Sequence, residues 1–407
     1  MQAEKTYAMK ILFVIDTFDT NNNGTSISAQ RFAMELRRRG HEVRILCSDV
    51  PDTDADGNVL PVDVTQKYIV KEYKVPIFNP LVKKHGFAFG DIMHGSQSTI
   101  RQAVEWADIV HSFMPFALEM KASSYAKNIG KPNTGAFHIQ PENLWSSVGL
   151  GKVGWIQNLS YRNFRDWHYY KFRHIHVPSS FMKNMLEERG YQAKIHVISN
   201  GIQDDFLRAG KNFIDNGRPK KTHELEGKIL ITMVGRLAGE KRQDVLINAV
   251  RHSRYADKIQ LAFAGRGPKY DEYVALGENL PNKPIFLYLT KDELIHHLGM
   301  TDLYVHASDM ESEAISCIEA FATGLVPVIA NSELSATPQF ALDGRSLFMP
   351  GNPKDLARAI DYWLDHPNEK KFMSELYYQS AKQYTLTNSV SKFEKMLQEE
   401  IDDCSKA

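Results

Sequence analysis

Two carboxylates, Glu311 and Glu319, stand eight residues apart at the expected start of a helix. Apolar residues at Ile315 and Ile318 follow helical spacing, and Gly324 ends the pattern. Eight residues span about 12 Å along a continuous helix, so the two acids do not share one proton. A helix N-terminus favours phosphate, so acids on both sides of it suit a ligand with hydroxyl groups flanking its phosphates, such as a nucleotide sugar. The plain alternative is two solvated acids on a helix surface.

Short apolar runs at 303–306 and 327–330 flank this helix, and each has the composition of a strand. A strand, a helix and a second strand form the unit from which parallel sheets are built. The loop before the helix in such a sheet opens at the carboxyl edge, where ligands bind. The sequence therefore predicts Glu311 in a ligand-binding loop and Glu319 in the helix behind it.

The same stretch resembles a known signature. Glu311 and Glu319 match the Glu-x7-Glu pattern of the retaining GT-B glycosyltransferases, most closely glycosyltransferase family 4, and 320–328 resembles the family sequence that follows it. Ser312 and Ala314 stand where the family usually has glycine. The resemblance implies that Glu311 binds the hydroxyl groups of the sugar and that Glu319 binds those of the ribose.

A predicted strand at 228–236 opens the second half of the chain and leads into a loop with two cations, Arg236 and Lys241. The run Val-Gly-Arg-Leu followed by Glu-Lys resembles the same family. Arginine contacts phosphate with two hydrogen bonds and lysine adds a point charge, so these residues are predicted to clamp a diphosphate. An ordinary surface loop with two cations is the alternative.

Further donor contacts are implied by the resemblance. Gly265 and Gly267 fit the family's Gly-x-Gly-Pro turn and would let backbone approach the nucleotide. Tyr288 lies near the end of the strand expected at 284–289, where the family usually holds the base, and the family commonly has glycine at this position. The remaining implied donor contacts are Gly235, Ala314 and Ile315.

The first half of the chain opens with an apolar run at 10–15 and a polar loop that ends in Gly24 and Thr25. No Gly-x-Gly-x-x-Gly follows this strand, which argues against a dinucleotide dehydrogenase. The resemblance places Gly24 and Thr25 near the diphosphate and the acceptor. It also places His138, at the end of a predicted strand at 133–138, near the sugar and the acceptor hydroxyl. A plain polar turn and a buried structural histidine are the alternatives.

The predicted fold class is α/β, of the GT-B type, with two Rossmann-like domains facing a cleft. We expect an acceptor-side domain at 1–203 and a nucleotide-sugar-binding domain at 204–385. The polar segment 204–226 is interpreted as the link between them, and a helix within 386–407 is expected to pack back on the first domain.

Composition narrows the class of protein further. The 407 residues are 43% hydrophobic and carry no net formal charge, so no nucleic-acid partner is expected. Three cysteines without metal-ligand spacing favour a reducing cytosol. No apolar run approaches the length of a membrane span. We expect no catalytic metal and no cofactor besides the donor substrate.

Two segments mix basic and aromatic residues, which suits either an anionic bilayer surface or a helix with an aromatic core face and a solvated basic face. They resemble the branch of the family that glycosylates diacylglycerol or phosphatidylinositol. The first, 67–89, holds Lys67, Lys71, Lys74, Lys83 and Lys84. The second, 152–173, holds Lys152, Arg162, Arg165, Lys171 and Arg173 with Trp155, Tyr161, Phe164, Trp167, Tyr169, Tyr170 and Phe172.

The resemblance implies a retaining glycosyltransferase that moves a hexose, from UDP-glucose or UDP-galactose, to a membrane lipid such as diacylglycerol. The implied catalytic residues are His138, Arg236, Lys241 and Glu311. The expected location is the cytoplasm, peripherally at the inner face of the cell membrane. Alternatives are a saccharide acceptor in capsule or exopolysaccharide synthesis, a GT-B sugar-nucleotide epimerase, and a subunit that keeps the fold without catalysis.

Overall fold

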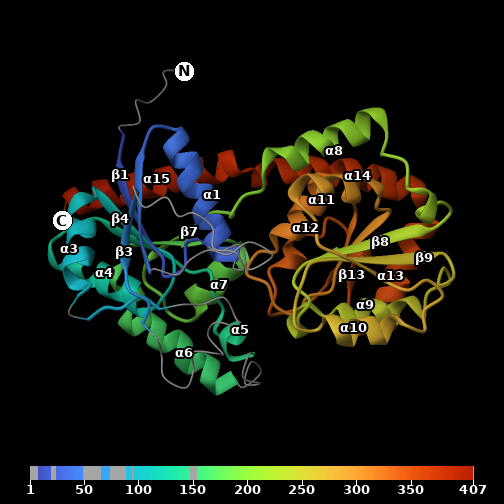
Figure 1. The fold of residues 1–407 in the computed structure, drawn as a ribbon, viewed down its shortest axis with the longest axis horizontal. Coiled ribbons are helices and arrows are strands. Elements are labelled where there is room, and N and C mark those ends of the chain that lie inside the picture. The colour runs from blue at the N-terminus through green and yellow to red at the C-terminus, as the bar shows by residue number, and fades with distance from the viewer. Residues whose placement is uncertain are drawn as a thin grey trace. The chain divides into compact units, whose positions relative to one another are not determined.

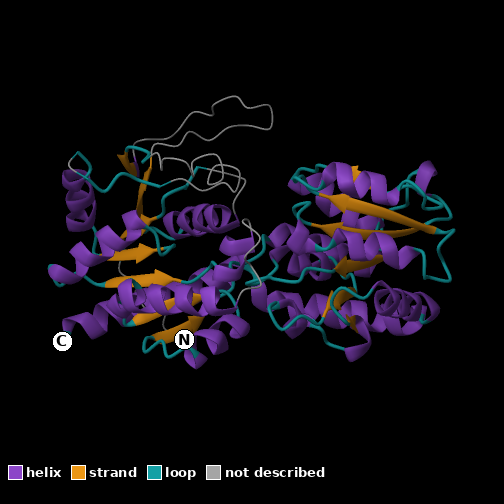
Figure 2. Cartoon of the chain, turned by 90° about the horizontal axis from the view of Figure 1, so that it is seen from below, coloured by secondary structure: helices purple, strands orange, loops and turns teal. Residues whose placement is uncertain are grey.

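A computed structural model describes residues 8–19, 24–48, 66–73, 89–93, 95–146 and 154–406. The chain divides into two compact units (Figures 1 and 2). The first consists of Met1–Ser199 together with Leu386–Ala407, and the second is Asn200–Thr385. Each unit is a parallel sheet with helices packed on it, and this confirms the predicted α/β class with two Rossmann-like sheets.

In the described part of the first unit, seven parallel strands lie in the order β3-β2-β1-β4-β5-β6-β7. The interior strand β1 is buried from Ile11 to Val14, as its continuous apolar run predicts. The strands are β1 Lys10–Val14, β2 Glu42–Ser48, β3 Lys67–Val70, β4 Ile109–Ser112, β5 Asn133–Ala136, β6 His174–Val177 and β7 Lys194–Val197. The helices are α1 Gly24–Arg38, α3 Gln97–Trp106, α4 Ala117–Asn128, α5 Pro141–Ser146, α6 Gly154–Trp167, α7 Ser180–Glu188 and α15 Leu386–Ser405.

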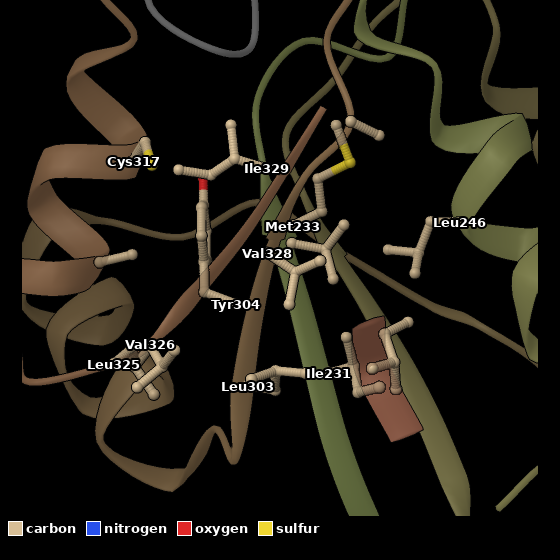
Figure 3. Close-up of a cluster of buried hydrophobic side chains, with 14 of the residues drawn as sticks. Ile231, Met233, Leu246, Leu303, Tyr304, Cys317, Leu325, Val326, Val328 and Ile329 are labelled. Atoms are coloured by element: carbon tan, nitrogen blue, oxygen red, sulfur yellow. The ribbon is translucent and has the colours of Figure 1, made fainter. Parts of the chain in front are cut away.

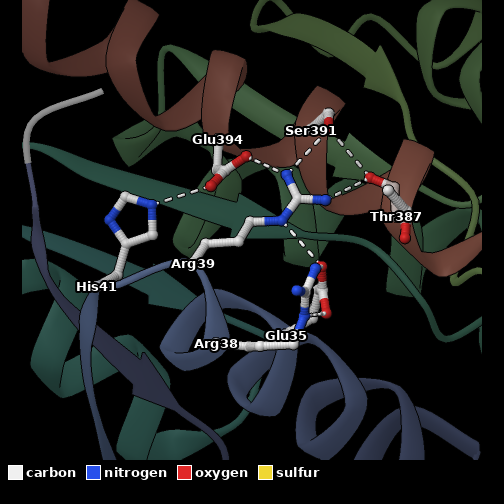
Figure 4. Close-up of polar contacts among 7 residues, drawn as sticks. All are labelled: Glu35, Arg38, Arg39, His41, Thr387, Ser391 and Glu394. Carbon is white, nitrogen blue, oxygen red and sulfur yellow. Dashed lines mark hydrogen bonds and ion pairs between the residues drawn. The ribbon is translucent and has the colours of Figure 1, made fainter. Parts of the chain in front are cut away.

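The last helix, α15, completes the core of the first unit although about half the chain separates it from the rest. Its apolar face buries Val390, Phe393 and Met396 against strand β1 and helix α1. Its polar face meets the end of α1, where the Arg39 guanidinium donates to the Thr387 carbonyl at 2.7 Å (Figure 4). The same figure shows His41 and Glu394 joined by a contact of 2.9 Å. Apolar burial and these polar contacts together attach α15 to the first sheet.

In the second unit, all of which the structure describes, six parallel strands lie in the order β10-β9-β8-β11-β12-β13. Figure 3 shows part of its core, where Ile329 lies beside Cys317 of the covering helix and Met233 belongs to the same buried cluster. The strands are β8 Ile229–Val234, β9 Ile259–Ala264, β10 Ile285–Leu287, β11 Leu303–His306, β12 Pro327–Ala330 and β13 Leu347–Phe348. The helices are α8 Asp204–Asn216, α9 Gln243–Val250, α10 Tyr270–Gly277, α11 Lys291–Met300, α12 Ile315–Ala322, α13 Pro353–Asp365 and α14 Pro367–Ala381.

The interpretation of 204–226 as a link is wrong for its first half, which forms helix α8 of the second unit. Two acidic residues, Asp204 and Asp205, occupy its first turn, where the helix dipole favours negative charge. Gly210 lies so close to α12 that a Cβ there would stand 2.0 Å from the Ala322 carbonyl oxygen. This glycine therefore allows two helices to pack closely and does not mark a flexible segment.

Candidate functional site

Four loops of the second unit meet at one edge of its sheet. They follow strands β10, β9, β8 and β11, which are consecutive neighbours in the sheet order. These loops carry Tyr288, the turn 265–267, the two cations Arg236 and Lys241, and Glu311. The carboxyl edge of a parallel sheet is where ligands of such folds bind. The structure thus brings the predicted donor residues of the second half to one edge.

The centre of this site is an ion pair between Lys241 and Glu311. The Lys241 Nζ donates to Glu311 Oε1 at 2.5 Å, and His306 Nε2 lies 3.0 Å from the same oxygen. Burial alone would raise the pKa of Glu311, but the charge of Lys241 and the hydrogen bond from His306 outweigh it and hold that pKa well below its usual value. Glu311 is therefore a fixed, ionised hydrogen-bond acceptor.

His306 is a site residue that sequence reasoning missed. It ends β11 and is buried, and its ring fixes the orientation of the Glu311 carboxylate. The sequence offered one signal for it: His306 stands at the carboxyl end of a predicted strand, five residues before Glu311.

The other predicted cation, Arg236, is half-buried in the loop after β8. Its side chain makes no hydrogen bond or ion pair with any residue that the structure describes, whereas its carbonyl accepts from Gln243 Nε2 at 2.9 Å. A fixed backbone and an uncommitted guanidinium suit a residue that binds an anionic ligand. Of the two predicted diphosphate residues, Arg236 is thus the free charge and Lys241 the paired one.

A third cation, Arg266, was also missed. Its guanidinium lies 3.7 Å from the ring centre of Tyr288, within range of a cation–π interaction. Tyr288 is 60% exposed, so the pair forms an aromatic surface at the predicted base position. Arg266 lies between two glycines, so the sequence indicated a role only for the backbone of this turn.

The glycines of the turn after β9 allow a close backbone contact within the protein. A Cβ on Gly265 would stand 2.1 Å from the Gly235 carbonyl oxygen, and one on Gly267 would stand 2.2 Å from that of Leu237. Gly265 also has a φ of +152°, which side chains rarely adopt. These glycines therefore hold two site loops against each other; contact with a nucleotide remains a prediction.

Arg242 joins the loop after β8 to the loop after β11. Its Nη1 lies 3.1 Å from Asp309 Oδ2, and the Asp309 amide donates to the Glu240 carbonyl at 2.8 Å. These links fix the segments that carry Lys241 and Glu311, so the ion pair forms between two anchored loops.

The helix behind Glu311 begins with strained backbone. Ala314 caps α12 with φ 71° and ψ 65°, the left-handed region that favours glycine. This is one of the two positions where the family usually has glycine. Ile315 is the first helical residue and Glu319 lies one turn further, 9% exposed. The helix N-terminus and Glu319 are thus on the element that the sequence predicted.

The remaining predicted residues lie in the first unit. Gly24 is the exposed first residue of α1, and a Cβ there would meet no atom within 4 Å; Thr25 follows it. His138 lies just beyond β5, beside the ring of His176 at 4.9 Å between centres. Burial lowers the pKa of His138 well below its usual value, so the ring is neutral. Its Nε2 has no hydrogen-bond partner among the described residues.

The second basic and aromatic segment, described from Gly154 onward, divides into a core face and an exposed face. Tyr161, Tyr169 and Phe172 are buried in one cluster. Trp155 and Trp167 are 70% and 64% exposed. Some aromatic residues of this segment therefore belong to the core, and others are exposed as a membrane-binding surface would require.

The expectation that Lys171 belongs to a basic surface is wrong. Lys171 is buried, and its Nζ donates to the Trp167 carbonyl at 2.7 Å. Burial lowers its pKa to about 8. Of the first segment, 74–88 lies outside the described residues, as does Lys152 of the second.

Comparison with known proteins identifies the class. Residues 22–206 match the family described as Glycosyltransferase Family 4, and 216–382 match that described as Glycosyl transferases group 1. Together with the two parallel sheets, these matches define the chain as a glycosyltransferase of the GT-B fold. It is of the type that combines a family 4 first half with a group 1 second half.

Individual relatives agree with this class. A GDP-mannose-dependent alpha-mannosyltransferase of Mycolicibacterium smegmatis is 26% identical over 334 residues, 79% of each chain. Anabaena Alr3699/HepE, solved with UDP and glucose, is 15% identical with a TM-score of 0.69 over 96% of this chain and 99% of its own. The catalytic domain of cholesterol-alpha-glucosyltransferase from Helicobacter pylori is 49% identical but covers 39% of this chain, and 99% of its own, with a TM-score of 0.38, so that match stands as a similarity alone.

Proposed function

We propose that the protein is a retaining hexosyltransferase that takes its sugar from a nucleoside diphosphate hexose, with UDP-glucose or UDP-galactose as the first donors to test. The observation that carries this proposal is the Lys241–Glu311 ion pair at the carboxyl edge of the second sheet, with Arg236 uncommitted on the same loop as Lys241. The unpaired Arg236 guanidinium and the N-terminus of α12 suit the phosphates of such a donor, and the ionised Glu311 carboxylate suits the hydroxyl groups of its sugar.

In the proposed reaction, the bond between the sugar and the diphosphate breaks and the acceptor oxygen attacks from the same face. Arg236 and Lys241 stabilise the negative charge that grows on the departing diphosphate. A phosphate oxygen of that group takes the proton of the acceptor hydroxyl, so no side-chain nucleophile is used. Glu311 accepts hydrogen bonds from the sugar and Glu319 from the ribose.

GDP-mannose is the second candidate donor, because the Mycolicibacterium smegmatis relative is described as dependent on it. The exposed Tyr288 ring with Arg266 against it offers a stacking surface that either a uracil or a guanine can use. The choice between the two nucleotides therefore rests on the donor assay.

We further propose a membrane lipid as acceptor. Trp155, Leu159 and Arg162 follow the spacing of one face of helix α6, and all three are exposed. An exposed face with aromatic and basic residues suits the interface of an anionic bilayer. Among the described residues, none of the helices combines the length and apolar character that crossing a bilayer requires. A saccharide acceptor is the alternative.

The test offers purified protein UDP-glucose, UDP-galactose or GDP-mannose, each with diacylglycerol in anionic liposomes or with soluble saccharides. We expect an α-linked hexose on the lipid from a UDP-sugar. Transfer from GDP-mannose alone would replace the donor proposal. Transfer to saccharides alone would overturn the lipid proposal, and conversion of the donor without any acceptor would indicate an epimerase.

A variant pair tests the membrane step separately. Trp155→Ser with Leu159→Ser should reduce both liposome binding and lipid transfer while leaving binding of the soluble donor unchanged. Phe372→Ser is the matched control, because Phe372 is 65% exposed on α14 of the second unit. Equal liposome binding by the double variant and the control would reject α6 as the membrane face.

A further inference from the structure

Three potential metal ligands of the first unit converge from strands β6 and β7 and helix α15. They are His174, His196 and Glu399, and one ligand atom from each lies within 4.8 Å of the other two. His174 Nδ1 is 2.8 Å from His196 Nε2, and His196 Nε2 is 3.9 Å from Glu399 Oε2. Chain segments far apart in sequence thus supply a compact group of two imidazoles and a carboxylate.

The outer nitrogen of His174 is held by a second carboxylate. His174 Nε2 lies 3.1 Å from Asp403 Oδ2, one helical turn beyond Glu399 on α15. A neutral His174 that donates from Nε2 to Asp403 leaves a lone pair on Nδ1, directed at His196. Histidine ligands of metals commonly donate their second nitrogen to a carboxylate in this way.

A buried acid beside the cluster is an independent observation. Glu400 is 3% exposed, and its Oε2 has no hydrogen-bond partner among the described residues. This oxygen lies 3.8 Å from His174 Nε2. A buried carboxylate oxygen without a hydrogen bond is costly unless positive charge lies near it.

We propose that His174, His196 and Glu399 bind a divalent transition-metal ion such as Zn2+, with Asp403 orienting His174. Metal–nitrogen bonds of about 2.0 to 2.1 Å in a tetrahedral site place ligand atoms about 3.4 Å apart, between the two separations observed here. Two imidazoles and one carboxylate suit zinc or cobalt better than magnesium. One coordination position is then left for water.

Lys194 is the competitor in the metal-free protein. Its ammonium forms an ion pair with Glu399, and its side chain is 61% exposed. Such an exposed ion pair contributes little to stability, so the lysine can turn away when a divalent ion reaches the carboxylate. The metal would then join α15 to β6 and β7, a structural role in the unit that does not hold Arg236 and Lys241.

The experiment titrates the full-length, chelator-treated protein with Zn2+ and with Co2+, using calorimetry and the visible absorption of bound cobalt. We expect one saturable site per chain, a cobalt spectrum of a four-coordinate ion, and a higher Tm with Zn2+ but not with Mg2+. Absence of saturable binding, or a cobalt spectrum typical of six-coordinate hydrated ion, would overturn the proposal.

Variants locate the site. His196→Asn and Glu399→Gln should abolish the four-coordinate cobalt spectrum, and Asp403→Asn should weaken affinity about 10- to 100-fold. Lys194→Met should instead tighten binding, because it removes the competing charge. His223→Asn, at an exposed histidine of the second unit, is the control. Unchanged binding in folded His196→Asn protein would also overturn the proposal. Calorimetry and the cobalt spectrum measure metal binding itself, so a change in stability does not affect the result.

Discussion

The Lys241 ammonium lies 2.5 Å from a carboxylate oxygen of Glu311 across two loops, although 70 residues separate them in the chain. Both side chains are largely buried. Removing one partner of such a pair leaves an uncompensated charge, so Lys241→Met should lower the free energy of unfolding by about 3 kcal/mol. Denaturant unfolding at pH 7 measures this change.

The pH dependence of that loss has a defined sign. The pKa of Glu311 is depressed from its usual value of 4.5 in the folded protein, so its stabilisation is complete above that value and is lost as pH falls through the folded pKa. The difference between wild type and Lys241→Met should therefore be largest at neutral pH and shrink below pH 4.5. The double variant with Glu311→Gln should recover part of the loss. A difference that is constant with pH would show that Lys241 acts through packing alone.

Arg236 should matter for turnover and not for stability, because its side chain has no partner among the described residues. Arg236→Ala is expected to reduce kcat at least ~100-fold, the scale of losing one preorganised charge contact in a transition state. Its Tm should stay near that of the wild type. Steady-state kinetics with whichever candidate donor supports transfer provide the measurement.

The control for this prediction is Arg358→Ala, which removes an exposed arginine paired with Asp355 on α13. That variant should keep full activity. Near-normal kcat in Arg236→Ala would remove Arg236 from the proposed diphosphate clamp.

Ala314→Gly should stabilise the protein. A residue other than glycine in the left-handed region costs about 1 to 2 kcal/mol, and the extra freedom of glycine in the unfolded chain takes back about 0.4 to 1 kcal/mol. The expected net gain is about 0.5 to 1 kcal/mol in the free energy of unfolding. Ala320→Gly, within the same helix at a fully buried position, should be destabilising instead. Two changes of the same sign would contradict strain at Ala314.

Gly265→Ala should damage the site through its backbone. The added methyl group would stand 2.1 Å from the Gly235 carbonyl oxygen, so one of the two loops must move. We expect a loss of at least about 2 kcal/mol of stability and weaker nucleotide binding, measured by thermal unfolding and calorimetry. Gly239→Ala is the control, because no atom lies within 4 Å of its Cβ position. Matching behaviour of the two variants would show that the loops separate without cost.

The sequence predicted those parts of the fold that continuous apolar runs encode. Strands such as β1 and β8 are recognisable because four consecutive residues in each are buried, and glycines or polar loops mark their ends. Helix α8 was missed because a glycine within a polar segment is typical of a flexible link, whereas Gly210 permits contact with α12. A glycine that faces another helix and a glycine in a link look alike in the chain.

The sequence predicted which residues belong to the candidate site but not which of them contact one another. Arg236, Lys241 and Glu311 could be named from their motifs, yet the pairing of Lys241 with Glu311 depends on β8 and β11 being adjacent in the sheet. Neither chain order nor spacing fixes that adjacency. Lys171 shows the same limit, because nothing in its sequence neighbourhood reveals that its side chain is buried.

The placement of α15 has a consequence for synthesis on the ribosome. Phe393 and Met396 fill the first unit's core, but they are translated after the whole of the second unit. Until α15 is synthesised, the apolar surface of the first unit that α15 covers stays exposed. The second unit is a continuous segment and can fold during this time. Completion of the first unit therefore follows synthesis of the second unit, and truncation before Leu386 removes a structural part of the first unit.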